Sequence, residues 1–199
     1  MAAKRQPRYQ QVAVVPEEEA RKDGNETREL SHLVWMIDDN NALVLDEHGN
    51  PHRCLVSEKY TCNGQHRQFA LPEKGVWHIQ KDDELNIFKR MRWCGHYIHW
   101  KENTCKGWGV LIQPNTYTLL LDQKYEIQVL GSGYNREELV ICKFVEGNAG
   151  EWHGYPINHT LRNEDYIPER IVKCWWQTFR VIGKSDYNDI RTKHTVDLL

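Results

Sequence analysis

From Leu30 onward, short apolar runs alternate with groups of turn-forming residues. The runs are rich in β-branched and aromatic residues and recur at intervals of about ten residues, which is typical of strands. They cover residues 33–37, 42–45, 52–56, 68–71, 75–79, 87–100, 108–112, 116–121, 125–130 and 138–144. The first two runs flank the polar turn Asp38-Asp-Asn-Asn41, which indicates a β-hairpin. The spacing predicts an antiparallel sheet that is curled, or folded into a sandwich or a half-barrel.

The pattern changes to a helical period near the carboxyl end. Pro168 suits the first position of a helix over residues 168–181. Its apolar positions recur at a spacing of three to four residues: Ile171, Val172, Trp175, Trp176 and Phe179. Gly183 ends this helix, and Ser185 can cap a second helix over residues 186–193. The predicted fold class is therefore α+β, mainly β, with a C-terminal helical hairpin.

These patterns divide the chain into three parts. Residues 1–29 contain Pro7, Pro16 and an acidic run, and they predict a flexible leader that holds at most one edge strand. Residues 30–149 are expected to form the antiparallel β domain. Residues 150–199 are expected to form a His-Gly-Tyr-Pro loop and the helical hairpin, packed on the sheet.

Charge and composition narrow the classes of function. The 199 residues include 26 Lys and Arg against 28 Asp and Glu, so the formal charge of -2 gives no global attraction to nucleic acid or anionic membranes. Residues 151–199 balance their charges, which argues against DNA reading by the hairpin. The basic, polar amino end and the lack of an apolar run near 18 residues predict a cytoplasmic protein without a membrane segment. The motifs of kinases, dehydrogenases, zincins and α/β-hydrolases are absent.

Four metal-ligating residue types gather in one stretch: Cys94, His96, His99 and Cys105. Structural zinc sites usually pair their ligands at short spacings such as Cys-x2-Cys, and the sequence contains none. The flanking residues favour a strand, in which positions three apart face opposite sides. We therefore expect free cysteines and no metal or other cofactor, with this set as the alternative.

The same region, residues 88–108, mixes aromatic residues with five basic residues against one acidic residue. Aromatic faces among cations are typical of single-stranded nucleic acid binding. The residues that would form such a surface are Arg90, Arg92, Trp93, Tyr97, Trp100, Trp108 and Trp152. In the alternative interpretation, alternate strand positions place Trp93 and Tyr97 in the core and leave Arg90, Arg92 and His96 in water.

The segment Gly150-Glu-Trp-His-Gly-Tyr-Pro156 offers a candidate for acid-base chemistry. His153 can transfer protons near neutral pH, and Tyr155 adds a phenol. Catalysis would also need a second titrating group, His96 or His99, and a cation, Arg90 or Arg92. In the alternative interpretation, Trp152 and Tyr155 only attach the sheet to the hairpin.

Three hypotheses about function remain open. The leading one is an immunity-like or adaptor-like protein that binds another macromolecule, foremost a protein, through an aromatic-rich surface, because Trp and Tyr dominate binding hot spots. The second is a metal-independent enzyme acting on RNA or nucleotides, with His153, Tyr155 and His96 or His99 as catalytic residues. The third is a binder of single-stranded nucleic acid. Whether the protein is an enzyme stays undecided at this stage.

Overall fold

The structure is a computed structural model that describes residues 24–68, 74–101, 104–116, 119–120, 123–147 and 150–192. Most of the expected leader lies outside these residues, but its last four residues already belong to the first strand. Parts of the predicted strands 68–71 and 116–121, and the end of the second predicted helix, also lie outside the described residues.

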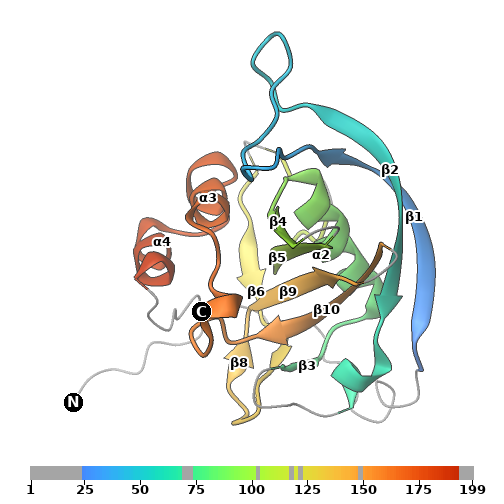
Figure 1. Cartoon of the computed structure of the whole chain (residues 1–199). Coiled ribbons are helices and arrows are strands. Elements are labelled where there is room, and N and C mark those ends of the chain that lie inside the picture. Colours follow the sequence, from blue (N-terminus) through green and yellow to red (C-terminus); the bar gives the residue numbers. More distant parts are fainter. Residues whose placement is uncertain are drawn as a thin grey trace.

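Two sheets form the scaffold (Figure 1). The large sheet comprises β1 (Glu26–Trp35), β2 (Arg53–Cys62), β4 (Tyr97–Lys101), β5 (Thr104–Gln113), β6 (Glu126–Gln128), β9 (Ile141–Glu146) and β10 (Glu151–Ile157). Its order is β1-β2-β10-β9-β5-β4, and β6 pairs with β5. The small sheet has the order β3-β7-β8 and comprises β3 (Val76–Trp77), β7 (Gly131–Ser132) and β8 (Glu138–Leu139). The mainly β fold and the half-barrel predicted from the strand spacing are confirmed.

The large sheet is mixed, and in this respect the antiparallel prediction is wrong. β1 and β2 pair antiparallel in unbroken register from Glu26 opposite Cys62 to Trp35 opposite Arg53. β10, however, lies parallel to β2 and antiparallel to β9. Because a parallel partner comes from a distant part of the chain, no local turn signal announces it.

The segment expected to be the His-Gly-Tyr-Pro loop is mostly strand β10, so that prediction is wrong. Glycine and proline suggested a loop, but Pro156 takes a ladder position opposite Cys142. The strand alternation sends its side chains to opposite faces of the sheet. Trp152 packs on Phe88 with ring centroids 5.5 Å apart, whereas His153 lies beside another histidine on the other face.

The predicted strand over residues 87–100 is also wrong, because its first half belongs to helix α2 (Lys81–Trp93). Leu85, Phe88 and Met91 recur every three residues on the buried face of this helix. Acidic residues fill its first turn and basic residues its last, which suits the helix dipole. The aromatic residues that follow α2 made the whole segment resemble a strand, whereas the acidic start was the helical signal.

The C-terminal helical hairpin is confirmed with shifted boundaries. It comprises α3 (Glu169–Lys173), which continues as the π-helical turn η3 (Cys174–Thr178), and α4 (Lys184–Arg191). Gly183 caps α4, and its N–H donates to the Asp186 carboxylate at 2.8 Å. Two short 3-10 helices, η1 (Gly64–Arg67) and η2 (Asn163–Asp165), complete the described helices.

The central strands are buried on both faces (Figure 1). α2 fills the concave face, where it packs with Tyr60, Phe144 and Trp152. The hairpin covers the convex face through Ile171 and Trp175. Two apolar clusters therefore hold β5, β9 and β10 between two helical layers.

One charged group lies deep in the α2 layer. Glu84 is fully buried and accepts hydrogen bonds from Tyr60 Oη at 2.6 Å and from the Arg67 guanidinium. Arg67 also donates to the backbone oxygen of Ile79 at 2.6 Å. Burial raises the pKa of Glu84, and Arg67 opposes this rise. The carboxylate thus joins η1, β2 and α2 at one point.

We predict that Glu84→Leu destabilises the protein by about 3–5 kcal/mol, because it leaves the Arg67 charge buried without its carboxylate. The double variant Arg67→Met/Glu84→Leu should recover a substantial part of this loss, since no unpaired charge remains. Urea unfolding monitored by circular dichroism measures the free energy of unfolding of both variants. The exposed Arg28 to Asp82 pair is the control, and Arg28→Ala should cost at most about 1 kcal/mol. Equal losses in the single and double variants would contradict the prediction.

Candidate functional site in the half-barrel

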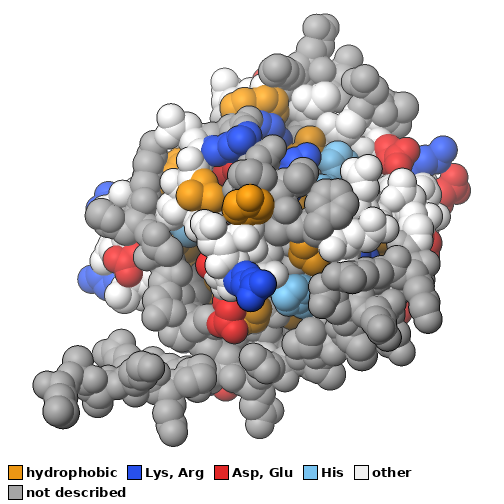
Figure 2. All heavy atoms as spheres, turned by 90° about the horizontal axis from the view of Figure 1, so that it is seen from below, with side chains coloured by type: hydrophobic (Ala, Val, Ile, Leu, Met, Phe, Trp, Pro, Cys, Tyr) orange, Lys and Arg blue, Asp and Glu red, His pale blue; other side chains and the backbone are white. Residues whose placement is uncertain are grey.

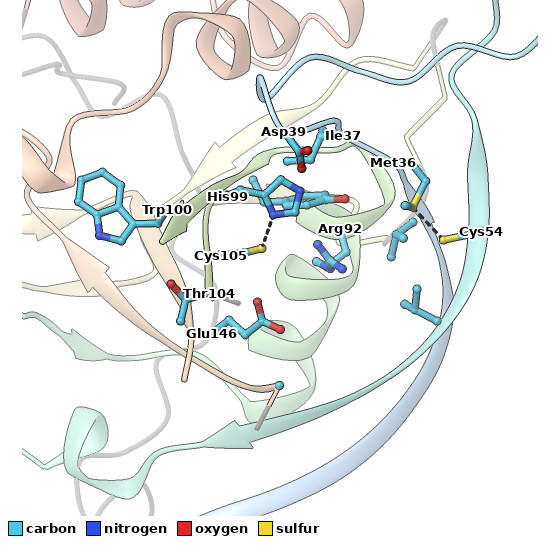
Figure 3. A pocket seen from close by; sticks show the side chains of 14 residues that line it. Met36, Ile37, Asp39, Cys54, Arg92, His99, Trp100, Thr104, Cys105 and Glu146 are labelled. Atoms are coloured by element: carbon cyan, nitrogen blue, oxygen red, sulfur yellow. Dashed lines mark hydrogen bonds between the residues drawn. The ribbon is translucent and has the colours of Figure 1, made fainter. Parts of the chain in front are cut away.

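An open cleft of about 870 Å³ lies inside the half-barrel, between the β1–β2 ribbon and strands β4 and β5 (Figure 3). Its lining residues are Val34, Met36, Ile37, Asp39, Cys54, Val56, Arg92, Tyr97, His99, Trp100, Thr104, Cys105, Glu146 and Gly150. The cleft exists because α2 ends at Trp93 and leaves the rest of the concave face uncovered. Its volume falls within the usual range of ligand-binding clefts.

The edge strand β4 beside the cleft is protected by side chains. The Asn41 amide accepts a hydrogen bond from the N–H of His99 at 2.6 Å and donates to its carbonyl oxygen at 3.5 Å. Arg170 donates to the carbonyl oxygens of Gly95 and Tyr97 at 2.7 and 2.6 Å. These contacts block addition of a further strand at this edge and hold His99 in place.

Arg92 lies at the base of the cleft, and its charge is already matched. Its guanidinium donates to both carboxylate oxygens of Glu58 at 2.6 and 3.1 Å and lies 4.0 Å from the ring centre of Tyr97. Burial raises the pKa of Glu58, but the contacts with His32 and Arg92 outweigh it, and the net shift is downward. Nη1 of Arg92 has no hydrogen-bond partner among the described residues. This nitrogen is itself buried, and the charge of Arg92 is neutralised by Glu58, so Arg92 adds no surplus of positive charge to the cleft.

Cys105 and His99 form a close pair in the cleft (Figure 3). The Cys105 Sγ and His99 Nδ1 atoms are 3.4 Å apart. Burial, together with the charge and hydrogen bond of Glu146, raises the pKa of the Cys105 thiol to about 12. The thiol is therefore protonated at neutral pH, which is the opposite of the lowered pKa that activates a nucleophilic cysteine.

Trp100 is the exposed aromatic residue of the cleft. Its side chain is 46% exposed, and Lys106 Nζ lies 3.5 Å from its ring centre. Of the eight tryptophans, all of them in the described residues, five are buried and two are partly buried. The broad aromatic surface expected from the sequence is thus reduced to Trp100 at this site.

The structure brings only some of the predicted site residues to one place. Five of them line the cleft: Arg92, Tyr97, His99, Trp100 and Cys105. Trp108 and Trp152 are fully buried in the two apolar clusters, and Trp93 packs against Trp35.

The alternation that was expected to leave Arg90, Arg92 and His96 in water is wrong, because all three are buried. Arg90 donates to the carbonyl oxygens of Val110, at 2.7 Å, and of Thr116. His96 accepts a hydrogen bond from Trp175 Nε1 at 3.0 Å. The cause is that residues 90–92 are helical, so a strand period does not apply to them.

The candidate zinc set is divided between two places. Cys94 and His96 lie in the apolar layer beneath the hairpin, whereas His99 and Cys105 face the cleft. In the part of the chain that the structure describes, no group of three His, Cys, Asp or Glu side chains could hold a metal ion.

His153 and Tyr155 do not reach the cleft and do not meet His96 or His99. They lie on the other face of β10, beside His66 and Lys74. Sequence reasoning missed these two residues, and it also missed Asp39 and Glu146 in the cleft. The positions of His66 and Lys74 depend on the parallel pairing of β10 with β2, for which the sequence holds no local signal.

Comparison with protein-family models, with curated proteins and with solved structures finds no match to this chain.

We predict that Glu146→Gln makes Cys105 more reactive towards iodoacetamide at mildly alkaline pH. Loss of the carboxylate charge lowers the thiol pKa, and each unit of lowering increases the thiolate fraction about tenfold. Mass spectrometry of the alkylated peptide measures the rate at this residue. The control is Glu47→Gln, which removes an exposed carboxylate in a neighbouring turn. An unchanged rate in Glu146→Gln would show that Glu146 does not control the thiol.

Proposed function

We propose that the protein is a protein-binding module whose half-barrel cleft accepts a basic segment of a partner. The observation that carries this proposal is the pair of carboxylates, Asp39 and Glu146, that face the cleft beside the exposed Trp100 (Figure 3). The same cleft supplies no surplus of positive charge from Arg92, because Glu58 neutralises it.

The charge of the cleft favours a cationic ligand. Asp39 and Glu146 would repel a phosphate backbone, and nucleic-acid binding needs a local surplus of Lys and Arg. A Lys or Arg side chain, by contrast, can pair with these carboxylates and pack on the part of Trp100 that Lys106 leaves exposed. This argument favours a protein partner over single-stranded nucleic acid.

The remaining lining groups suit a short piece of polypeptide. Val34, Val56 and Met36 provide an apolar wall on the ribbon side. An apolar wall with a few placed polar groups is the usual composition of a binding site.

An adaptor-like or immunity-like role in the cytoplasm is part of the same proposal. The six cysteines are all free, which suits a reducing compartment. Within the described ranges, no helix has the length and apolar character that a membrane crossing requires.

The test is selection of short peptides from a random displayed library with the full chain as bait. We predict enrichment of Lys or Arg next to an apolar residue. Trp100→Ala should weaken binding of a selected peptide about 30-fold, as expected for a hot-spot tryptophan. Asp39→Asn/Glu146→Gln should weaken it about tenfold and reduce its dependence on salt. Fluorescence anisotropy of the labelled peptide at two salt concentrations measures both effects.

Glu47→Gln is the matched control, because it removes one exposed carboxylate outside the cleft. Selection of acidic or phosphorylated peptides, or tighter binding of single-stranded RNA than of the basic peptides, would contradict the proposal.

A further inference from the structure

We propose that a second site, formed by His66, Lys74, His153 and Tyr155 on the other face of β10, binds a phosphate group. It shares no side chain with the cleft, so it stands independently of the function proposed above.

The site is assembled by long-range pairing. β10 lies parallel to β2 with His153 opposite Thr61, and η1 follows β2 directly, so His66 comes next to His153. His153 and Tyr155 share one face because they are two positions apart on the strand. Lys74, just before β3, completes the group.

The four side chains are close enough to hold one small ligand. The imidazole rings of His66 and His153 are nearly parallel, with centroids 6.3 Å apart. The Tyr155 ring lies 5.1 Å from His66, and Lys74 Nζ lies 4.8 Å from the Tyr155 ring centre. Figure 2 views the molecule from the end where β3 lies, and histidine, basic and acidic side chains gather near the centre of that surface.

Three of these groups have nitrogen atoms that form no hydrogen bond or ion pair with the described residues. Within the described part of the chain, the ring nitrogens of His66 and His153 make no hydrogen bond, and they are not sealed from solvent. Lys74 contacts the Tyr155 ring but forms no ion pair with a described carboxylate. Two imidazoles and one ammonium, which the ring of Tyr155 connects, are therefore left as donors.

The electrostatics indicate an anion as the missing partner. Burial and the Lys74 charge lower the pKa of His66 to about 4, and His153 adds to this effect. The pKa of His153 is lowered by burial and by Lys74, against the opposing charge of Glu151. The carboxylate of Glu151 already accepts a hydrogen bond from Thr61 Oγ1. Burial is the larger cause of both lowered pKa values, and the ammonium of Lys74 adds to it; a bound anion would oppose the part that comes from Lys74.

Phosphate fits this arrangement better than a carboxylate. It carries up to two negative charges and offers oxygen atoms in three or more directions, whereas a carboxylate offers two. Three separate nitrogen donors can be satisfied by one phosphate group. Protonation of His66 or His153 strengthens the interaction, so a bound phosphate raises the pKa of both imidazoles.

The test is a pH titration of the histidine ring signals by NMR, with and without inorganic phosphate at millimolar concentration. We predict that phosphate raises the pKa of both His66 and His153 and leaves the ring signals of the exposed His48 where they are without phosphate. Calorimetry measures the affinity of the wild-type protein and of the variants for phosphate at one pH. Lys74→Ala should weaken binding about tenfold or more, whereas Lys173→Gln, which removes an exposed lysine on α3, should have no effect.

The same measurements with a second ligand identify the source of the phosphate group. A nucleoside monophosphate that binds more tightly than inorganic phosphate would assign the site to a phosphate monoester, and equal affinity would assign it to the free anion. Unchanged histidine signals in phosphate, or the same shifts with acetate or chloride, would overturn the proposal. The wild-type titration needs no substitution, so a variant that fails to fold leaves the test intact.

Discussion

The close contact between α2 and β5 is the constraint on which the rest of the structure depends. A Cβ atom on Gly107 would lie 2.3 Å from Met91 Sδ, and one on Gly109 would lie 2.5 Å from Ile87 Cγ2. A side chain at Gly109 would have to displace Ile87, and one at Gly107 would have to move the end of Met91, so glycine at these positions favours the close approach of α2. The sheet curls around the helix instead of packing flat, and the cleft begins where the helix ends.

The aromatic residues of the chain mostly serve this packing. Trp77, Trp108, Trp152 and Trp175 are fully buried, which explains a tryptophan count that the sequence alone left ambiguous. Buried aromatic layers also impose a condition on the charges that accompany them, since a buried ion needs a partner. Arg92 satisfies this condition through Glu58. The charge of Arg92 is therefore neutralised within the protein, and Asp39 and Glu146 give the cleft its acidic character.

The sequence predicted what depends on local patterns. Alternating apolar runs indicated a mainly β half-barrel, and the spacing of Ile171, Trp175 and Phe179 indicated the helical hairpin. Local patterns failed where two signals competed. Aromatic residues after Trp93 hid α2, and Gly154 with Pro156 hid β10.

The residues of the two candidate sites also differ in whether a local sequence pattern could predict them. One short stretch of the sequence contains five of the cleft residues: Arg92, Tyr97, His99, Trp100 and Cys105. The end of α2 and the β4–β5 hairpin that follows bring them to one cleft. Asp39 and Glu146 reach it from distant strands. His66 and Lys74 reach His153 only because β10 inserts beside β2, a pairing that no spacing rule reveals.

Strand β10 also explains why the two candidate sites can be tested separately. Trp152 faces the concave side, where its ring lies 5.1 Å from the Arg92 guanidinium at the base of the cleft. The next residue, His153, faces the opposite side and belongs to the phosphate site. One strand thus serves both sites through neighbouring residues, but their side chains never share a surface. A substitution on one face leaves the charges of the other unchanged, so loss of binding at one site with retention at the other would locate each function on its own face of the sheet.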